Sequence, residues 1–112
     1  MTLLQEFGRF IEASHQTSFS AATLHSARRA LLDWHGALIA GADTEAASRL
    51  REAYGDEFGV GHCSVAGSQK KVFARAAAFM NGTISHIAEF DDIFRDGAYH
   101  PACPTISAVL AL

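Results

Sequence analysis

The chain has 112 residues and a mass of 12.0 kDa, enough for one domain with a buried core or for part of a larger domain. Hydrophobic residues make up 49% of it and charged residues 19%, which excludes a disordered tail, and no apolar run approaches the roughly 20 residues that span a bilayer. The formal net charge of −3 gives no indication of a nucleic-acid-binding protein.

Two amphipathic helices are predicted in the first part of the chain. Apolar side chains recur at helical spacing over Leu3–Ala13, and Thr2 can cap that helix. The second helix is predicted over Ser20–Ala40, and Gly41 is a natural residue to end it. Its apolar stripe consists of Leu24, Ala27, Leu31, Trp34 and Leu38. Small residues near its end would allow another helix to approach closely.

A polar surface helix and a glycine-rich loop are predicted next. The helix is expected over Thr44–Tyr54, with Gly55 ending it. The stretch 55–67 contains four glycines and is predicted to be a loop, with one short extended piece at His62–Ala66.

Three further helices are predicted in the rest of the chain. The fourth is expected over Ser68–Met80 and is ended by Asn81-Gly82; the fifth is expected over Ile84–Phe90, and the sixth begins near Pro104. The predicted core side chains are Leu31, Trp34, Leu38, Phe73 and Phe79. The fold class is therefore all-α, with about six helices and short connections. The final PTISAVLAL begins a helical pattern without a stop signal, so we expect the front part of a longer protein.

The segment 81–105 concentrates the residues that can carry chemistry. Two histidines and four carboxylates lie between positions 86 and 100: His86, Glu89, Asp91, Asp92, Asp96 and His100. On a helix, His86 and Glu89 would share a face. A solvated acidic helix end would explain the carboxylates, but negative charge opposes the dipole at a helix C-terminus, and such a local conflict also indicates a site.

His100 stands directly before Pro101, which favours an extended backbone at the histidine and a loop position ahead of the last helix. A histidine in a cleft there can serve as a general acid or base, because its ordinary pKa lies near neutrality. The alternative is a loop histidine that only caps a neighbouring group.

No metal-binding motif occurs, although His86, Glu89 and His100 could in principle meet around an ion. We expect no metal and no cofactor. Cys63 and Cys103 have no C-x-x-C spacing and are expected to be small buried residues of a protein in the reduced cytoplasm.

Taken together, these strings resemble the MmgE/PrpD family, which includes 2-methylcitrate dehydratase, cis-aconitate decarboxylase and iminodisuccinate epimerase. The family pattern is approximately A-A-x-x-N-G-x-x-x-H-x-x-D-[FY]-D-D-T, a variable loop, then H-P-x-x-[AP]-x-x-P-A-x-x-A-L. This chain reads AAAFMNGTISHIAEFDDIF and then HPACPTISAVLAL. The resemblance covers about Leu4 to Leu112 and implies the N-terminal portion of the family's large helical domain, over residues 1–112.

The resemblance also implies a chemistry and a set of residues. The family abstracts a proton next to a carboxylate without a metal, then eliminates water or carbon dioxide or reprotonates the carbon. His100 matches the family's active-site histidine of the H-P pair. Three positions match its substrate-binding region: Glu89, Asp92 and Ile93. Arg95 lies in the loop where family members vary and is expected to bind substrate as the cation near the site. Glu89 stands where an aspartate is usual and Ile93 where a threonine is common, so the pocket is expected to differ from one built for 2-methylcitrate.

The expected function is accordingly a lyase, a dehydratase acting on a small di- or tricarboxylate, of which this chain carries part of the site. Epimerisation or decarboxylation within the same family is the first alternative. The second is a non-catalytic helical module that only associates with another chain. A homodimer is expected, and neither nucleic acid nor a membrane is an expected partner.

Overall fold

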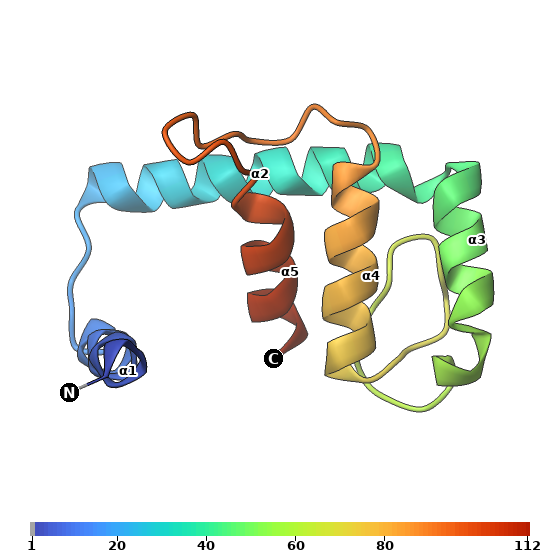
Figure 1. Cartoon of the computed structure of the whole chain (residues 1–112), viewed down its shortest axis with the longest axis horizontal. Coiled ribbons are helices and arrows are strands. Elements are labelled where there is room, and N and C mark those ends of the chain that lie inside the picture. Colours follow the sequence, from blue (N-terminus) through green and yellow to red (C-terminus); the bar gives the residue numbers. More distant parts are fainter. Residues whose placement is uncertain (1) are drawn as a thin grey trace.

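The long helix α2 (Ala21–Ala42) is the element against which the other helices pack (Figure 1). In this computed structural model, which describes residues 2–112, α4 (Ala74–His86) and α5 (Ala102–Ala111) lie side by side and both contact α2. The remaining elements are α1 (Leu3–Ser14), α3 (Glu45–Ala53) and a 3-10 turn, η1 (Gly55–Glu57). Residues 2–112 form two isolated β-bridges and no strand, which confirms the all-α prediction.

Helix starts follow the capping residues in the sequence. Thr2 caps α1 in a reciprocal box, because its side chain accepts from the Gln5 amide and the Gln5 side chain accepts from the Thr2 amide. Ser20 and Thr44 cap α2 and α3 without the reciprocal bond, because their hydroxyl oxygens accept from the Thr23 and Ala47 amides. These three caps place the starts of the first three helices within one residue of the prediction.

The boundaries of α4 correct the prediction. Val72 pairs with Cys63 through two backbone hydrogen bonds of 3.0 Å, so residues 68–73 are not helical and α4 begins at Ala74. The helix then continues through Asn81-Gly82 to His86, and the separate helix predicted at Ile84–Phe90 does not exist. This merging leaves five α-helices within residues 2–112, where about six were expected.

Tertiary contacts explain why Asn81 does not end the helix. Its side-chain oxygen accepts from the Ala66 amide at 3.0 Å, and its side-chain nitrogen donates to the Ser64 carbonyl at 2.9 Å. The amide side chain thus joins α4 to the preceding loop instead of competing for the backbone of its own helix.

The crossing of α2 and α4 depends on the absence of a side chain at Gly41. A Cβ atom there would lie 2.0 Å from the Ile84 carbonyl oxygen. Gly41 is therefore buried inside the helix contact, and α2 ends one residue later, at Ala42. The predicted close approach of another helix is confirmed. The helix was expected to end before Gly41, but it ends at Ala42.

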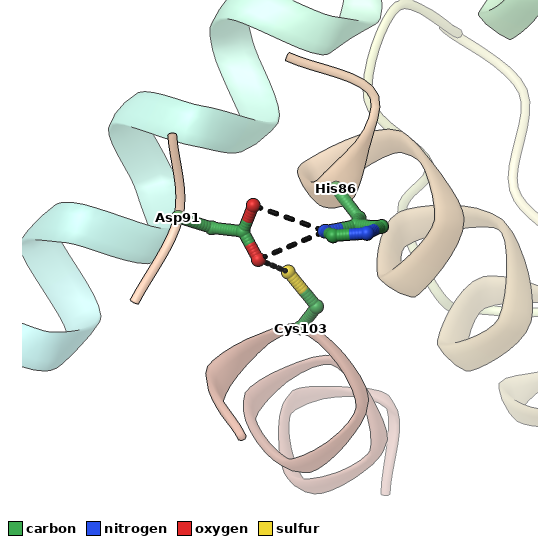
Figure 2. Close-up of side chains that lie close together, drawn as sticks. All are labelled: His86, Asp91 and Cys103. Atoms are coloured by element: carbon green, nitrogen blue, oxygen red, sulfur yellow. Dashed lines mark hydrogen bonds and ion pairs between the residues drawn. The ribbon is translucent and has the colours of Figure 1, made fainter. Parts of the chain in front are cut away.

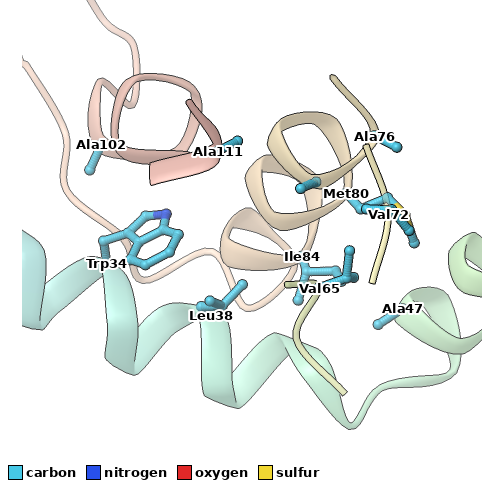
Figure 3. Packing of buried hydrophobic residues seen from close by; sticks show 11 residues of the cluster. Trp34, Leu38, Ala47, Val65, Val72, Ala76, Met80, Ile84, Ala102 and Ala111 are labelled. Atoms are coloured by element: carbon cyan, nitrogen blue, oxygen red, sulfur yellow. The ribbon is translucent and has the colours of Figure 1, made fainter. Parts of the chain in front are cut away.

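Mostly small and medium side chains, together with the Trp34 indole, fill the core between α2, α4 and α5 (Figure 3). Trp34 and Leu38 are buried as predicted, and the Trp34 indole N–H donates to the buried Ser107 hydroxyl of α5 at 3.1 Å. The other predicted core residues are wrong: Leu31, Phe73 and Phe79 are 44%, 55% and 52% exposed. Met80, one position from Phe79, faces the core in its place, because α4 presents that side to α2 and α5.

Helix α1 stands apart from the other helices (Figure 1). None of its side chains is buried, and Leu3, Leu4, Phe7, Phe10 and Ile11 are all exposed. The radius of gyration is 15.7 Å, against about 13 Å for a compact domain of this length. No helix within residues 2–112 has both the length and the apolar character needed to cross a membrane.

Candidate functional site

The segment 87–101 connects α4 to α5, passes across α2 in Figure 1, and buries one carboxylate. Asp91 has no exposed side-chain surface. His86 Nδ1, at the end of α4, lies 3.0 Å from Asp91 Oδ1 and 3.1 Å from Oδ2, and the Cys103 thiol of α5 donates to Oδ2 at 2.9 Å (Figure 2). Asp91 therefore joins two helices that contribute donors to it.

His100, the predicted catalytic residue, reaches the same carboxylate. Its Nδ1 atom lies 3.0 Å from Asp91 Oδ2 but is not aligned for a hydrogen bond, and this buried nitrogen has no other partner among the described residues. The His86 and His100 rings are tilted by 59° with centroids 4.7 Å apart. Two imidazoles thus face one aspartate, with side chains 47% and 33% exposed respectively.

The protonation states in this cluster follow from burial and hydrogen bonding. Burial alone would raise the pKa of Asp91, but the hydrogen bonds from Cys103 and His86 outweigh it and hold the pKa below its ordinary 3.8. Burial and the neighbouring Asp91 carboxylate raise the pKa of the Cys103 thiol to about 11. Near neutral pH the cluster therefore contains an ionised aspartate and a protonated thiol.

Asp92 lies beside Asp91 in sequence but has a different role. Its Oδ1 atom accepts from the Ala102 amide at 3.0 Å, so it caps the start of α5. Pro104, in the first turn of that helix, has no N–H to offer. The positive end of the α5 dipole is thus largely occupied by Asp92, and this helix start offers few free amides to an anion.

A pocket of about 540 Å³ opens between α4 and α5 beside the two histidines. Its lining combines apolar walls with two hydroxyls, a thiol and two imidazoles: Ala78, Phe79, Gly82, Thr83, His86, Tyr99, His100, Cys103 and Pro104. No lysine or arginine of the described chain lines it. A larger hollow of about 800 Å³, lined by Trp34, Leu38 and the end of α5 among others, contains no carboxylate.

The other predicted site residues lie outside the lining of this pocket. Glu89, Ile93 and Arg95 are exposed on the connecting segment, and Glu89 adopts a positive φ of 51°, which is uncommon for a residue with a side chain. The structure therefore brings His100 to the pocket, uses Asp92 to hold the helix behind it, and leaves the remaining three at the surface.

Sequence reasoning placed Asp91 in the acidic segment but did not select it, and it treated Cys103 only as a buried residue. The spacing from His86 to Asp91 matches neither helical nor strand periodicity, so the sequence carries no signal of their contact. One signal concerned Cys103, which follows His100 by three residues, about one helical turn. Both side chains reach the Asp91 carboxylate.

One group of side chains in the described chain has the donor types of a metal site. Atoms of His86, Asp91 and Cys103 lie within 4.8 Å of one another. In this structure the three residues are joined by hydrogen bonds, from His86 and from the Cys103 thiol to the Asp91 carboxylate. The geometry is therefore that of a hydrogen-bond network.

Comparison with known proteins gives one match. The model of the MmgE/PrpD N-terminal domain matches residues 5–112. No curated protein and no solved structure matches the chain.

Proposed function

The chain belongs to the MmgE/PrpD family, with residues 5–112 matching its N-terminal domain, and on that premise we propose that it forms part of a lyase for a small di- or tricarboxylate. The observation that carries the proposal is the placement of His100 on an apolar pocket with its Nδ1 atom against the buried Asp91. Low cysteine content is consistent with a protein of the cytoplasm.

In the proposed reaction His100 acts as the general base. Because Nδ1 faces Asp91, the other ring nitrogen, Nε2, faces away from the carboxylate and is available to substrate. It takes the proton from the carbon next to a substrate carboxylate, the electron pair forms the C=C bond, and hydroxide leaves from the adjacent carbon and is protonated to water. Ionised Asp91 stabilises the resulting imidazolium.

The remaining predicted residues have supporting roles in this proposal. Asp92 caps α5 and thereby holds the histidine at the helix start. Arg95 is the cation of the segment 87–101 and would pair with a substrate carboxylate, which guanidinium groups bind in bidentate fashion. Glu89 and Ile93 are exposed on the same segment outside the pocket lining, and in this proposal they contact the outer part of a bound substrate, Glu89 at a hydroxyl.

The test is the His100→Asn variant of the full-length gene product, assayed on a panel of di- and tricarboxylates that includes 2-methylcitrate. We expect kcat to fall about 10²–10⁴-fold, the usual contribution of general acid–base catalysis. His25→Asn, an exposed substitution on α2, is the control and should keep normal turnover. Near-normal turnover by His100→Asn on every accepted substrate would refute the assignment.

Product analysis separates the reactions of the family. A dehydratase yields an unsaturated acid with all its carboxylates, a decarboxylase releases carbon dioxide, and an epimerase changes only the configuration at one carbon.

A second candidate function, a helical association module, is favoured by the exposed apolar side chains of α1. It predicts self-association without turnover of any carboxylate.

A further inference from the structure

Asp91 is shared between two imidazoles that come from different parts of the chain. His86 ends α4, and His100 lies just before α5, yet the Nδ1 atoms of both lie 3.0 Å from an Asp91 oxygen. Both rings also line the same pocket of about 540 Å³. Figure 2 shows the His86 ring with one nitrogen directed at Asp91 and the other directed away.

The chemistry of the carboxylate determines where the ring protons are. An ionised carboxylate can only accept hydrogen bonds, so the nitrogen of His86 that bonds to it must carry the proton. At His100 a bare Nδ1 lone pair would face Asp91 Oδ2 at 3.0 Å and be repelled, whereas an N–H there is attracted. The hydrogen bond to Asp91 thus fixes His86 as Nδ1–H, and at His100 the short distance to Oδ2, without hydrogen-bond alignment, favours the same tautomer.

We propose that His86 is a second proton-transfer group beside His100, and that Asp91 is the positioning residue that holds both imidazoles with Nε2 available to the pocket. This inference rests on the proposed function and adds a second acid–base residue to it. The His86 side chain is 47% exposed, so it is not buried in the helix packing.

Charge balance explains why two imidazoles on one carboxylate suit an elimination. One carboxylate balances one imidazolium, and a second positive ring at a centroid distance of 4.7 Å would be repelled by the first. In the proposed step one ring therefore acts as the base and the other as the acid.

The proton balance of the step is complete within the pair. Neutral His100 takes the proton from the substrate carbon at Nε2, and the imidazolium of His86 gives its Nε2 proton to the departing hydroxide, which leaves as water. The two rings have then exchanged protonation states, and proton exchange with solvent restores them. Asp91 remains ionised throughout.

The first experiment measures the tautomers directly, by nitrogen-15 NMR of the imidazole rings in the 112-residue chain above neutral pH. We expect His86 and His100 both as Nδ1–H. In Asp91→Asn at least one ring should change to Nε2–H, whereas Asp96→Asn, an exposed charge change in the same segment, should change neither. An Nε2–H tautomer at either ring of the wild type would overturn the proposal, and this result does not depend on whether the variant folds.

The second experiment separates proton transfer from structure, in the full-length gene product with an accepted substrate. His86→Gln should slow elimination of water about 10²-fold or more, while exchange of the substrate C–H with deuterated solvent, catalysed by His100, continues. Equal loss of exchange and elimination would show a purely structural role for His86 and refute its proton-transfer role.

The two proposals fail in distinguishable ways. No turnover of any carboxylate by the wild-type protein would refute the proposed function and with it the proton-transfer role of His86. The NMR tautomers would still decide whether Asp91 positions both rings. Normal turnover combined with a wild-type Nε2–H tautomer would refute the positioning role alone.

Discussion

Asp91 is a buried carboxylate kept ionised by donors from α4 and α5, and this arrangement makes the stability of the domain depend on pH. Its folded pKa lies below the ordinary 3.8. Above that ordinary value the carboxylate is ionised in both folded and unfolded chains, and its hydrogen bonds contribute fully. As the pH falls from there through the folded pKa, the unfolded chain binds the proton first, so this contribution is lost.

We therefore expect Asp91→Asn to remove part of the acid sensitivity of folding. The measurement is the free energy of unfolding by urea, from neutral pH down to about pH 3. Asp96→Asn, on the exposed part of the same segment, should keep the wild-type pH dependence. Identical slopes for Asp91→Asn and the wild type in the acid range would contradict this prediction.

Cys103 should be an unreactive thiol in the folded protein. A rise of its pKa from 9.0 to about 11 lowers the thiolate fraction near neutrality about 10²-fold, and burial also blocks reagents. Iodoacetamide should modify the partly exposed Cys63 first and Cys103 only on unfolding, as followed by mass spectrometry. The Cys63→Ser variant isolates the rate of Cys103, and labelling there as fast as in urea would contradict the expectation.

At the scale of helix pairs, two glycines of α2 offer a matched comparison. Gly41→Ala places a Cβ 2.0 Å from the Ile84 carbonyl oxygen, so α2 and α4 must separate. We expect a loss of about 1–3 kcal/mol of stability, despite the better helix propensity of alanine. At Gly36 a Cβ meets nothing within 4 Å, and Gly36→Ala should instead stabilise by about 0.5–1 kcal/mol. Equal effects in urea unfolding would show that the helix crossing tolerates a side chain.

The packing of α2 against α5 depends on Trp34. Trp34→Ala removes a buried indole and its hydrogen bond to Ser107 and should cost about 3–5 kcal/mol. Phe79→Ala, at a residue that the sequence pattern placed in the core, should cost only about 1 kcal/mol, because Phe79 is half exposed and its ring centroid lies 5.5 Å from that of Tyr54. Chemical denaturation of both variants tests this order, and a larger loss for Phe79→Ala would reverse it.

At the scale of the whole molecule, α1 presents an apolar face that the rest of the described chain does not cover. Such a face favours association, so sedimentation should give a mass above 12.0 kDa, and we expect a homodimer. Replacing Phe7 and Phe10 with aspartate should shift the population to monomer, while Glu12→Gln should not. A wild-type chain that stays monomeric at high concentration would contradict both the dimer and the role of α1.

The sequence by itself determined the features that depend on neighbouring residues. Thr2 was predicted as a cap, and Ser20 and Thr44 stand at the predicted helix starts, because a cap is a contact over three positions. The all-α class and the family were also predicted, since helical periodicity and the string from Asn81 to Pro101 are local properties.

Only the tertiary structure decided the features that depend on distant residues. Asn81 continues α4 because its side chain binds the loop at Ser64 and Ala66, and the choice of Met80 over Phe79 for the core depends on where α2 and α5 lie. The contact of Asp91 with His86, His100 and Cys103 has the same origin. The connecting segment has to fold back across α2 before these groups can meet, and no periodicity in the sequence encodes that path.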